Sequence, residues 1–200
     1  MVETSPPRPR ALRQITRDAV RTRIADIAID LFAEHGFDRV TVDQIAAAAG
    51  ISTRSFNRYF PVKEDTVMGD AELWGETVRD AFIARPSEEP AWASLHSAFD
   101  RMLATSQVDA AREKKMLLVL VGAPTLRARH LEKHQSWAGL LVPLVRERLA
   151  GSDTEVRAEA IVHAAIACFD VAVMSWARAE EDRPAREFLR IAFDARLVSA

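Results

Sequence analysis

The sequence predicts an all-α protein in which an N-terminal three-helix, helix-turn-helix domain precedes a larger helical domain. Apolar residues recur at spacings of three and four through most of the chain, which is typical of amphipathic helices. Helix-capping and helix-stopping residues follow one another at short intervals in the first third of the chain, and no stretch shows the alternation of a β-strand. We expect about nine helices in total.

Composition favours a soluble globular protein, because 48% of the 200 residues are hydrophobic and 28% are charged. The single cysteine, Cys168, excludes an internal disulfide framework, and no apolar stretch follows the basic N-terminus to form a signal peptide. We therefore expect a cytoplasmic location. Residues 160–177 approach membrane-spanning length, but His163 and Asp170 interrupt them, which predicts a buried helix and no membrane span.

Charge is unevenly distributed along the chain. Residues 1–63 hold 10 Lys and Arg against 7 Asp and Glu, whereas residues 64–200 hold 17 against 22. The basic end is therefore the candidate for binding a polyanion. Its first residues are rich in proline and arginine, which predicts a flexible basic arm over residues 1–16, either without a role or reaching the phosphates or minor groove of DNA.

Residues 17–66 carry the pattern of the predicted helix-turn-helix domain. An amphipathic helix over 17–35 stops at Gly36. The sequence TVDQ from Thr41 is a capping box that opens a helix over 42–49, which Gly50 ends in a left-handed turn. A third helix over 53–60 stops at Pro61.

The larger domain, residues 67–200, is predicted to be helical throughout. A fourth helix begins at Val62 or Lys63 and reaches Ala84, where ARPSEEP breaks the chain. Further helices are predicted over residues 90–106, 109–121, 125–150, 153–180 and 184–198.

The two short helices around Gly50 divide into an inner and an outer set of residues. A steep crossing of two short helices needs small or apolar residues at fixed places, and the sequence supplies Ile45, Ala46, Ala49, Ile51, Phe56 and Tyr59. The positions left pointing outward on the second helix are Thr53, Arg54, Ser55, Asn57 and Arg58. Side chains of these lengths reach base edges and phosphates, and Arg54 is the best candidate for bidentate contact with guanine.

The segment from Arg21 to about Glu64 resembles the DNA-binding domain of the tetracycline-repressor (TetR) family, through LFAEHGFDRVTVDQIAAAAGIS and SFNRYFPVKED. The resemblance implies that Thr41 and Lys63 clamp phosphates and that Tyr59 lies beside the DNA backbone. One position departs from the family pattern, because Asn57 stands where members usually place a tyrosine along the phosphates. Asn57 is shorter and cannot stack, which leaves phosphate anchoring at that position in doubt.

Few residues suggest catalysis or metal binding. His130 and His134 have the spacing of metal ligands, but Glu132 points to another face, so the zinc-hydrolase pattern is absent and surface or pocket-rim histidines are favoured. Cys168 lies in an apolar helix, which favours packing over nucleophilic chemistry. We therefore expect no catalytic residues, no metal and no cofactor.

A ligand cavity in the larger domain is a further expectation. Asp170 and His163 lie in an otherwise apolar helix and need partners when buried, from the protein itself, a second subunit or a ligand. Aromatic and methionine side chains at helical spacing suit either a plain core or a cavity. The candidate cavity residues are Phe99, Met102, Met116, His134, Trp137, Asp170 and Trp176.

A homodimer is expected because one helix-turn-helix makes too few base contacts for useful specificity, whereas two copies read a palindrome. The predicted helices over 125–150 and 153–180 are the candidates for the interface, the second carries a stripe of small residues suited to a four-helix interface, and the family resemblance implies the same region. The stripe comprises Ile161, Ala164, Ala165, Cys168, Val171, Ala172 and Ser175.

Together these features predict a transcriptional regulator, most simply a repressor that leaves a palindromic DNA operator when a small apolar effector binds. An activator of the same fold is the nearest alternative, and a helical enzyme or ligand carrier with an incidental N-terminal motif is the alternative from another class.

Overall fold

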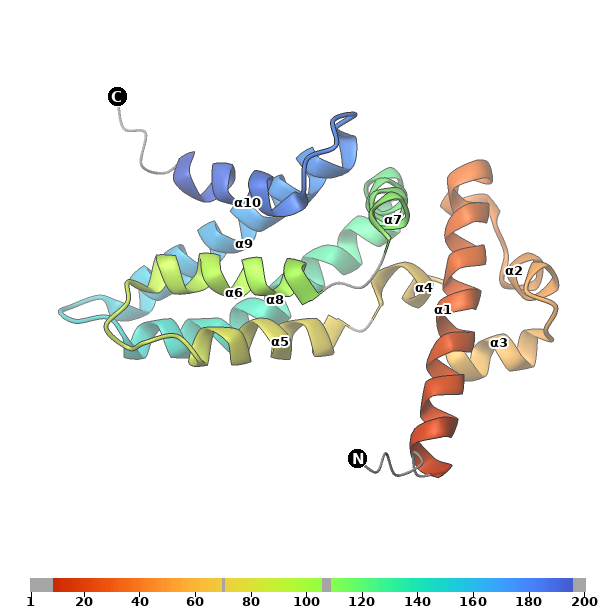
Figure 1. Cartoon of the computed structure of the whole chain (residues 1–200), viewed down its shortest axis with the longest axis horizontal. Helices are drawn as coiled ribbons and strands as arrows, with labels where there is room; N and C mark the ends of the chain where they lie inside the picture. Colours follow the sequence, from red (N-terminus) through yellow and green to blue (C-terminus); the bar gives the residue numbers. More distant parts are fainter. Residues whose placement is uncertain (1–8, 70, 106–108, 196–200) are drawn as a thin grey trace, which may run out of the picture. The chain divides into compact units, whose positions relative to one another are not determined.

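The computed structural model describes residues 9–69, 71–105 and 109–195, all of its regular elements being helices (Figure 1). The chain divides into two compact units, Met1–Gly69 and Asp70–Ala200. We call these unit 1 and unit 2 and describe each by itself. The predicted all-α class is confirmed, with ten α-helices and one short 3-10 helix among the described residues against the nine or so expected.

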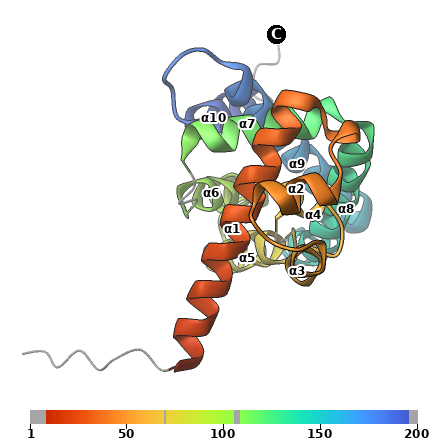
Figure 2. The same ribbon diagram turned by 90° about the vertical axis from the view of Figure 1, so that its right-hand side faces the viewer.

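Unit 1 is built on one long helix. Its elements are α1 (Pro9–His35), η1 (Phe37–Arg39), α2 (Val42–Ala48), α3 (Thr53–Tyr59) and α4 (Asp65–Met68). Figures 1 and 2 both show α2 and α3 as short helices beside α1. Among the described residues of unit 1, the buried apolar ones are Ile24, Ala28, Ile29, Phe32, Phe37, Val40, Ile45, Ala46, Phe56, Phe60 and Val67.

The start of α1 corrects the predicted arm. The helix begins at Pro9, so the residues from Pro9 to Thr16 that we expected to be flexible belong to it. A proline in the first turn is compatible with a helix because its missing N–H would have no intrahelical partner there. Residues 1–8, the remainder of the predicted arm, lie outside the described part of the chain.

The predicted fourth helix is in fact two helices. Helix α4 ends at Met68, and α5 (Ala71–Ile83) begins only after Gly69, whose φ of 63° is left-handed. A left-handed residue cannot continue a right-handed helix, and glycine adopts that conformation without a steric penalty. The boundary between the units lies at this glycine.

Unit 2 is a helical bundle around one apolar core. After α5 come α6 (Ala91–Thr105), α7 (Ala110–Gly122), α8 (Pro124–Glu147), α9 (Thr154–Arg178) and α10 (Ala185–Asp194). Helix α9 contacts α6, α7, α8 and α10, and α8 also contacts α5. By length and composition alone α9 would suffice to cross a membrane, but half of its most apolar window is buried inside the protein, which fits the predicted core helix.

The turn between α5 and α6 is held by the guanidinium of Arg148. This group donates to the carbonyl oxygens of Phe82 (3.1 Å), Arg85 (3.2 Å) and Pro86 (3.2 Å), and lies 4.1 Å from the centre of the Phe82 ring. Because the last carbonyls of a helix lack intrahelical partners, Arg148 caps α5 from a distant part of the chain.

Glu89 closes the same turn. It accepts hydrogen bonds from Arg85 (2.6 and 2.8 Å) and from the Ser94 hydroxyl (2.6 Å). Those bonds stabilise the carboxylate and lower the pKa of Glu89 to about 2. The segment that the sequence marks only as a break is therefore a fixed turn.

Candidate nucleic-acid interface and the polar cluster of unit 2

The turn between α2 and α3 has the predicted geometry. The Thr41 hydroxyl accepts from the Gln44 amide (3.2 Å), and the Gln44 side chain accepts from the Thr41 amide (2.8 Å), so the predicted capping box is confirmed. Gly50 is left-handed, with φ of 69°, and the Ile51 amide donates back to the Ala46 carbonyl (3.0 Å). These bonds fix where α2 begins and where the chain turns into α3.

Helix α3 is anchored at both ends. The Ser52 hydroxyl caps its start by accepting from the Ser55 amide (3.2 Å), and Phe56 and Phe60 bury its inner side with ring centres 5.6 Å apart. The Thr53 hydroxyl donates to the Asp43 carboxylate (2.6 Å), which ties α3 to α2. Helix α3 is therefore held in a defined orientation within unit 1.

Half of the predicted inner residues are confirmed as buried. Ile45, Ala46 and Phe56 are buried, whereas Ala49, Ile51 and Tyr59 are only half-buried. Among the predicted outer residues, Arg54, Asn57 and Arg58 are exposed. We call these three the recognition face.

Thr53 and Ser55 are placed differently from the recognition face. Both are half-buried, and both hydroxyls have partners inside the motif: Asp43 for Thr53, and Ser52 for Ser55 (3.0 Å). Their first role in this structure is to fix α3. The sequence gives no local sign of the Asp43 contact, because the two residues lie on different helices.

Lys63 makes internal contacts in this structure. Its ammonium donates to the carbonyl oxygens of Phe37 (2.8 Å) and Val40 (2.9 Å), and lies 4.3 Å from the centre of the Phe37 ring. The charge is thus directed into unit 1, where it satisfies the carbonyls of the segment leading to α2. Lys63 therefore supports the start of α2 in this structure, and the phosphate contact that the family resemblance implies stays a prediction.

Thr41 and Tyr59 remain available at the edge of the motif. Thr41 is exposed, and its hydroxyl proton is not used by the capping bond, in which the oxygen is the acceptor. Tyr59 is half-buried, and the Arg58 guanidinium lies 5.3 Å from the centre of its ring. Both side chains can donate a hydrogen bond to a phosphate.

In unit 2, the candidate cavity residues lie in or against one core. Phe99, Met102, Trp137 and Trp176 are buried in it, and Met116 packs against it half-buried. The Phe99 ring stacks on the Phe169 ring with centres 4.9 Å apart, and the centre of the Trp137 ring lies 6.0 Å from that of Phe169. Sequence reasoning missed Phe169, which carries no polar or spacing signal.

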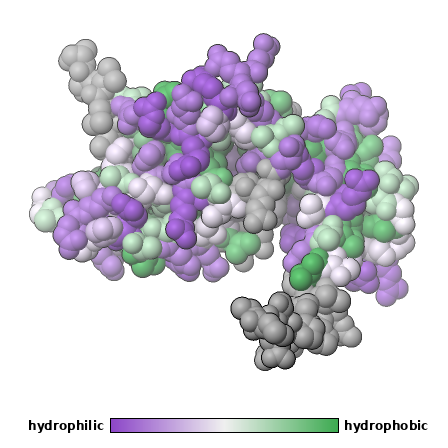
Figure 3. All heavy atoms as spheres, in the orientation of Figure 1, coloured by the Kyte–Doolittle hydropathy of each residue, from purple (hydrophilic) through white to green (hydrophobic). Residues whose placement is uncertain are grey.

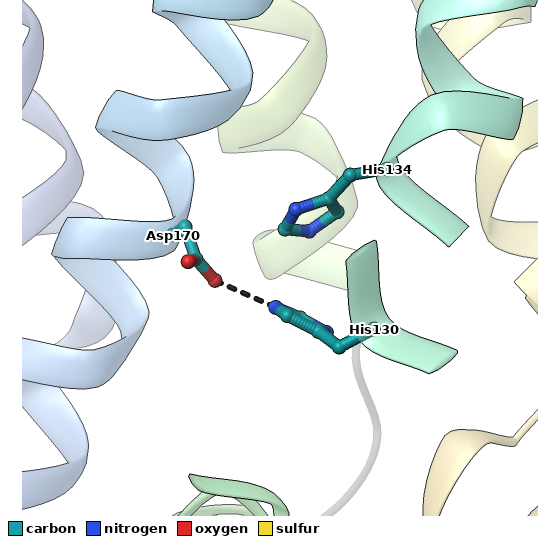
Figure 4. A group of neighbouring side chains, drawn as sticks. All are labelled: His130, His134 and Asp170. Atoms are coloured by element: carbon teal, nitrogen blue, oxygen red, sulfur yellow. Dashed lines mark hydrogen bonds and ion pairs between the residues drawn. The ribbon is translucent and has the colours of Figure 1, made fainter. Parts of the chain in front are cut away.

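A polar cluster lies beside this core, formed by His130, His134 and Asp170 (Figure 4). The His130 Nε2 atom lies 2.7 Å from Asp170 Oδ1. Both histidines are buried, at 7% and 8% exposure, which excludes the surface position, one of the two alternatives expected beside a pocket rim. His163, by contrast, is exposed and needs no buried partner.

The surroundings of this cluster change its protonation. Burial, reinforced by the neighbouring His130 and Lys133, lowers the pKa of His134, so the ring stays neutral. Burial raises the pKa of Asp170, but the hydrogen bond and charge of His130 outweigh it, so the net pKa is lower than usual. Burial also lowers the pKa of Lys133 to about 8.

The small-residue stripe of α9 divides into three sets by exposure. Ala165 and Ala172 are fully buried in the core of unit 2, so they cannot contact a partner as expected. Ile161 and Cys168 are half-buried, and Ala164, Val171 and Ser175 are exposed. A helix turns about 100° per residue, so residues three and four positions apart do not lie directly above one another. A stripe built from both spacings is therefore wide, and one edge of it faces the core.

Comparisons with known proteins agree with the geometry of unit 1. Residues 24–67 match the bacterial regulatory proteins of the tetR family. A protein of Mycobacterium tuberculosis named as a mycofactocin biosynthesis transcriptional regulator, MftR, is 30% identical over 183 residues, which cover 89% of each chain. The HTH-type transcriptional regulator TcmR of Streptomyces glaucescens is 28% identical over 203 residues, covering 98% of this chain and 88% of that protein.

Solved structures show the same fold. FadR of Thermus thermophilus, a TetR-family transcriptional repressor in complex with lauroyl-CoA, superposes with a TM-score of 0.52 at 24% identity, over 88% of this chain and 93% of that one. The capped and anchored α2–α3 pair, its exposed recognition face and the similarity to MftR over nearly the whole length lead to one conclusion. The chain belongs to the tetR family of bacterial regulatory proteins and is a DNA-binding transcriptional regulator.

Proposed function

We propose that this regulator is a cytoplasmic repressor that binds a palindromic operator as a homodimer and leaves it when a small apolar molecule binds unit 2. The observation that carries the proposal is the recognition face. Arg54, Asn57 and Arg58 are exposed on a helix whose other side is anchored by Phe56 and by the Thr53–Asp43 bond. A rigid helix with exposed guanidinium and amide groups is the usual means of reading a major groove.

Dimerisation follows from the size of this face. Three side chains on a helix of seven residues contact only a few base pairs, so specific binding needs a second copy on the same duplex. The exposed members of the stripe, Ala164, Val171 and Ser175, support α9 as part of the dimer interface. Half-sites would then lie about 34–36 Å apart, or a multiple of that distance.

The effector proposal is supported by the aromatic core of unit 2 and by two structures of similar fold. FadR is described in complex with lauroyl-CoA and SmeT in complex with triclosan. We propose that an effector here contacts the cluster of Phe99, Trp137 and Phe169. It needs only to favour the conformation that does not fit DNA, and tenfold to hundredfold discrimination corresponds to about 1.4–2.7 kcal/mol of coupling.

Selection of bound fragments from random DNA tests the core of the proposal. A symmetric site, bound with an affinity that falls steeply with salt, would support it. An asymmetric site bound by a single chain would contradict the dimer, and no salt-dependent binding at all would contradict DNA recognition.

Release is tested separately. The labelled operator complex is titrated with lauroyl-CoA, with triclosan and with the substrates and products of enzymes that are encoded near the gene for this chain. Loss of DNA binding with one of them supports an effector-released repressor. A complex indifferent to every compound would count against effector release, and increased transcription on binding would identify an activator.

A further inference from the structure

The polar cluster of unit 2 joins two helices. His130 and His134 lie one turn apart on α8, and Asp170 faces them from α9. One donor atom from each residue lies within 4.8 Å of those from the other two. Figure 4 shows the ring of His134 beside the hydrogen bond that joins His130 to Asp170.

The cluster is only partly satisfied by the protein. His134 Nε2 and His130 Nδ1 are buried and have no hydrogen-bond partner among the described residues. A buried polar atom left without a partner costs about 1–3 kcal/mol, so His134 Nε2 calls for a ligand. His130 would meet the same ligand through the Nε2 atom that now lies against Asp170, and its Nδ1 atom does not contribute to the site. His134 is only 8% exposed, so its ring is largely shielded from bulk water.

The donor set narrows the chemistry of that ligand. Two imidazoles and one carboxylate are the ligands of zinc and its transition-metal neighbours, whereas magnesium and calcium prefer oxygen alone. Histidines at positions i and i+4 of a helix reach one metal ion together. Burial keeps His134 neutral, the form in which imidazole binds a metal.

The distances require only small movements. Donor atoms around a tetrahedral zinc ion lie about 3.4 Å apart. The His130–Asp170 distance of 2.7 Å would lengthen as an ion replaces the shared proton. The other separations are no larger than 4.8 Å and would close by roughly 1.4 Å at most, a change that side-chain rotation can supply.

We propose that His130, His134 and Asp170 bind one divalent transition-metal ion of the zinc class, with a fourth coordination position left for water or a donor atom of a ligand. This reverses the expectation from the sequence that the chain binds no metal. The reversal comes from Asp170, 40 residues from His130 along the chain, which only the packing of α9 on α8 brings to the histidine pair.

Lys133 provides a test of whether the ligand of the cluster carries a positive or a negative charge. The residue is half-buried, and its ammonium lies 4.8 Å from the centre of the Trp137 ring and interacts electrostatically with Asp170. A nearby positive charge weakens binding of a cation and strengthens binding of an anion. Lys133→Met therefore increases the affinity for Zn²⁺ if the cluster is a metal site.

The experiment uses the full chain after removal of metals with a chelator. We expect equilibrium dialysis to give one Zn²⁺ per chain, and Co²⁺ to show the visible absorption of a four-coordinate site. His134→Ala and Asp170→Asn each lower the affinity at least about tenfold. His163→Ala, which removes an exposed histidine from α9, leaves it unchanged.

Asp170→Asn keeps the size of the side chain, and tryptophan fluorescence on heating checks that each variant is folded. Failure of the wild-type chain to bind Zn²⁺ would overturn the proposal. It would also be overturned by binding that survives both His134→Ala and Asp170→Asn, or by weaker binding in Lys133→Met. None of these results depends on DNA binding, so the proposed function stands or falls separately.

Discussion

Lys63 offers the clearest test of how unit 1 is held together. Replacing it with methionine keeps most of the aliphatic stem but removes the ammonium that donates to Phe37 and Val40 and lies over the Phe37 ring. A hydrogen bond from a charged donor contributes about 1.5–3 kcal/mol, and a cation over a ring about 0.5–1 kcal/mol at exposed sites. Because water can partly reach this half-buried site, we expect Lys63→Met to destabilise unit 1 by about 2–3 kcal/mol.

Hydrogen exchange followed by mass spectrometry measures this change where it occurs. A decrease of 2–3 kcal/mol in the free energy of opening corresponds to roughly 30- to 150-fold faster exchange of the α2 and α3 amides. All four tryptophans lie in unit 2, so their fluorescence reports on that unit independently and is expected to stay unchanged.

The competing role, a phosphate clamp, gives a different result. Removing a phosphate contact lowers the slope of log affinity against log salt by about 0.9 for each chain and leaves hydrogen exchange unchanged. We expect the opposite pattern: faster exchange with the salt slope preserved. A reduced slope with unchanged exchange would refute the internal role that the structure gives Lys63.

Four further outcomes are expected. Arg148→Met removes the cap of α5 and lowers the free energy of unfolding of unit 2 by about 2–4 kcal/mol, measured by urea denaturation with tryptophan fluorescence, and an effect below 0.5 kcal/mol would contradict the capping role. The carboxylate of Glu89 contributes stability above its ordinary pKa of 4.5 and loses that contribution as the pH falls toward 2, so Glu89→Gln flattens this part of the stability profile, whereas an unchanged profile would contradict the contribution. Gly75→Ala places a methyl group 2.8 Å from Trp137 Cδ1, so we expect a loss of about 1–3 kcal/mol in thermal denaturation, and a stabilised variant would show that the ring can move away. Thr53→Val breaks the tie to Asp43 and speeds exchange in α3 by an amount equivalent to about 1 kcal/mol, whereas unchanged exchange would mean that the tie does not hold the helix.

The local features of unit 1 could be predicted because their causes lie close together in the sequence. The capping box at Thr41 and the left-handed turn at Gly50 each depend on residues within a few positions. Gly69 has the same kind of signal, but the apolar pattern continues on both sides of it, so the predicted helix ran through the break between α4 and α5.

Contacts between distant residues could not be predicted from spacing. The exposed recognition face follows from helical periodicity, but the tie between Thr53 and Asp43 does not. The ammonium of Lys63 turns inward to donate to two carbonyls more than twenty residues away. Asp170 meets His130 only after α8 and α9 have packed, so the sequence does not show that Asp170 and the two histidines form one cluster.

The most direct test of DNA reading by α3 compares the wild-type chain with Arg54→Ala on a set of operators in which each base pair is changed in turn. Arg54 is exposed, so its replacement is expected to leave hydrogen exchange in unit 1 unchanged. We expect the variant to lose discrimination of about 1–3 kcal/mol at one base pair in each half-site and to keep discrimination elsewhere. Weakening by the same factor on every operator, or no weakening at all, would contradict base reading by Arg54.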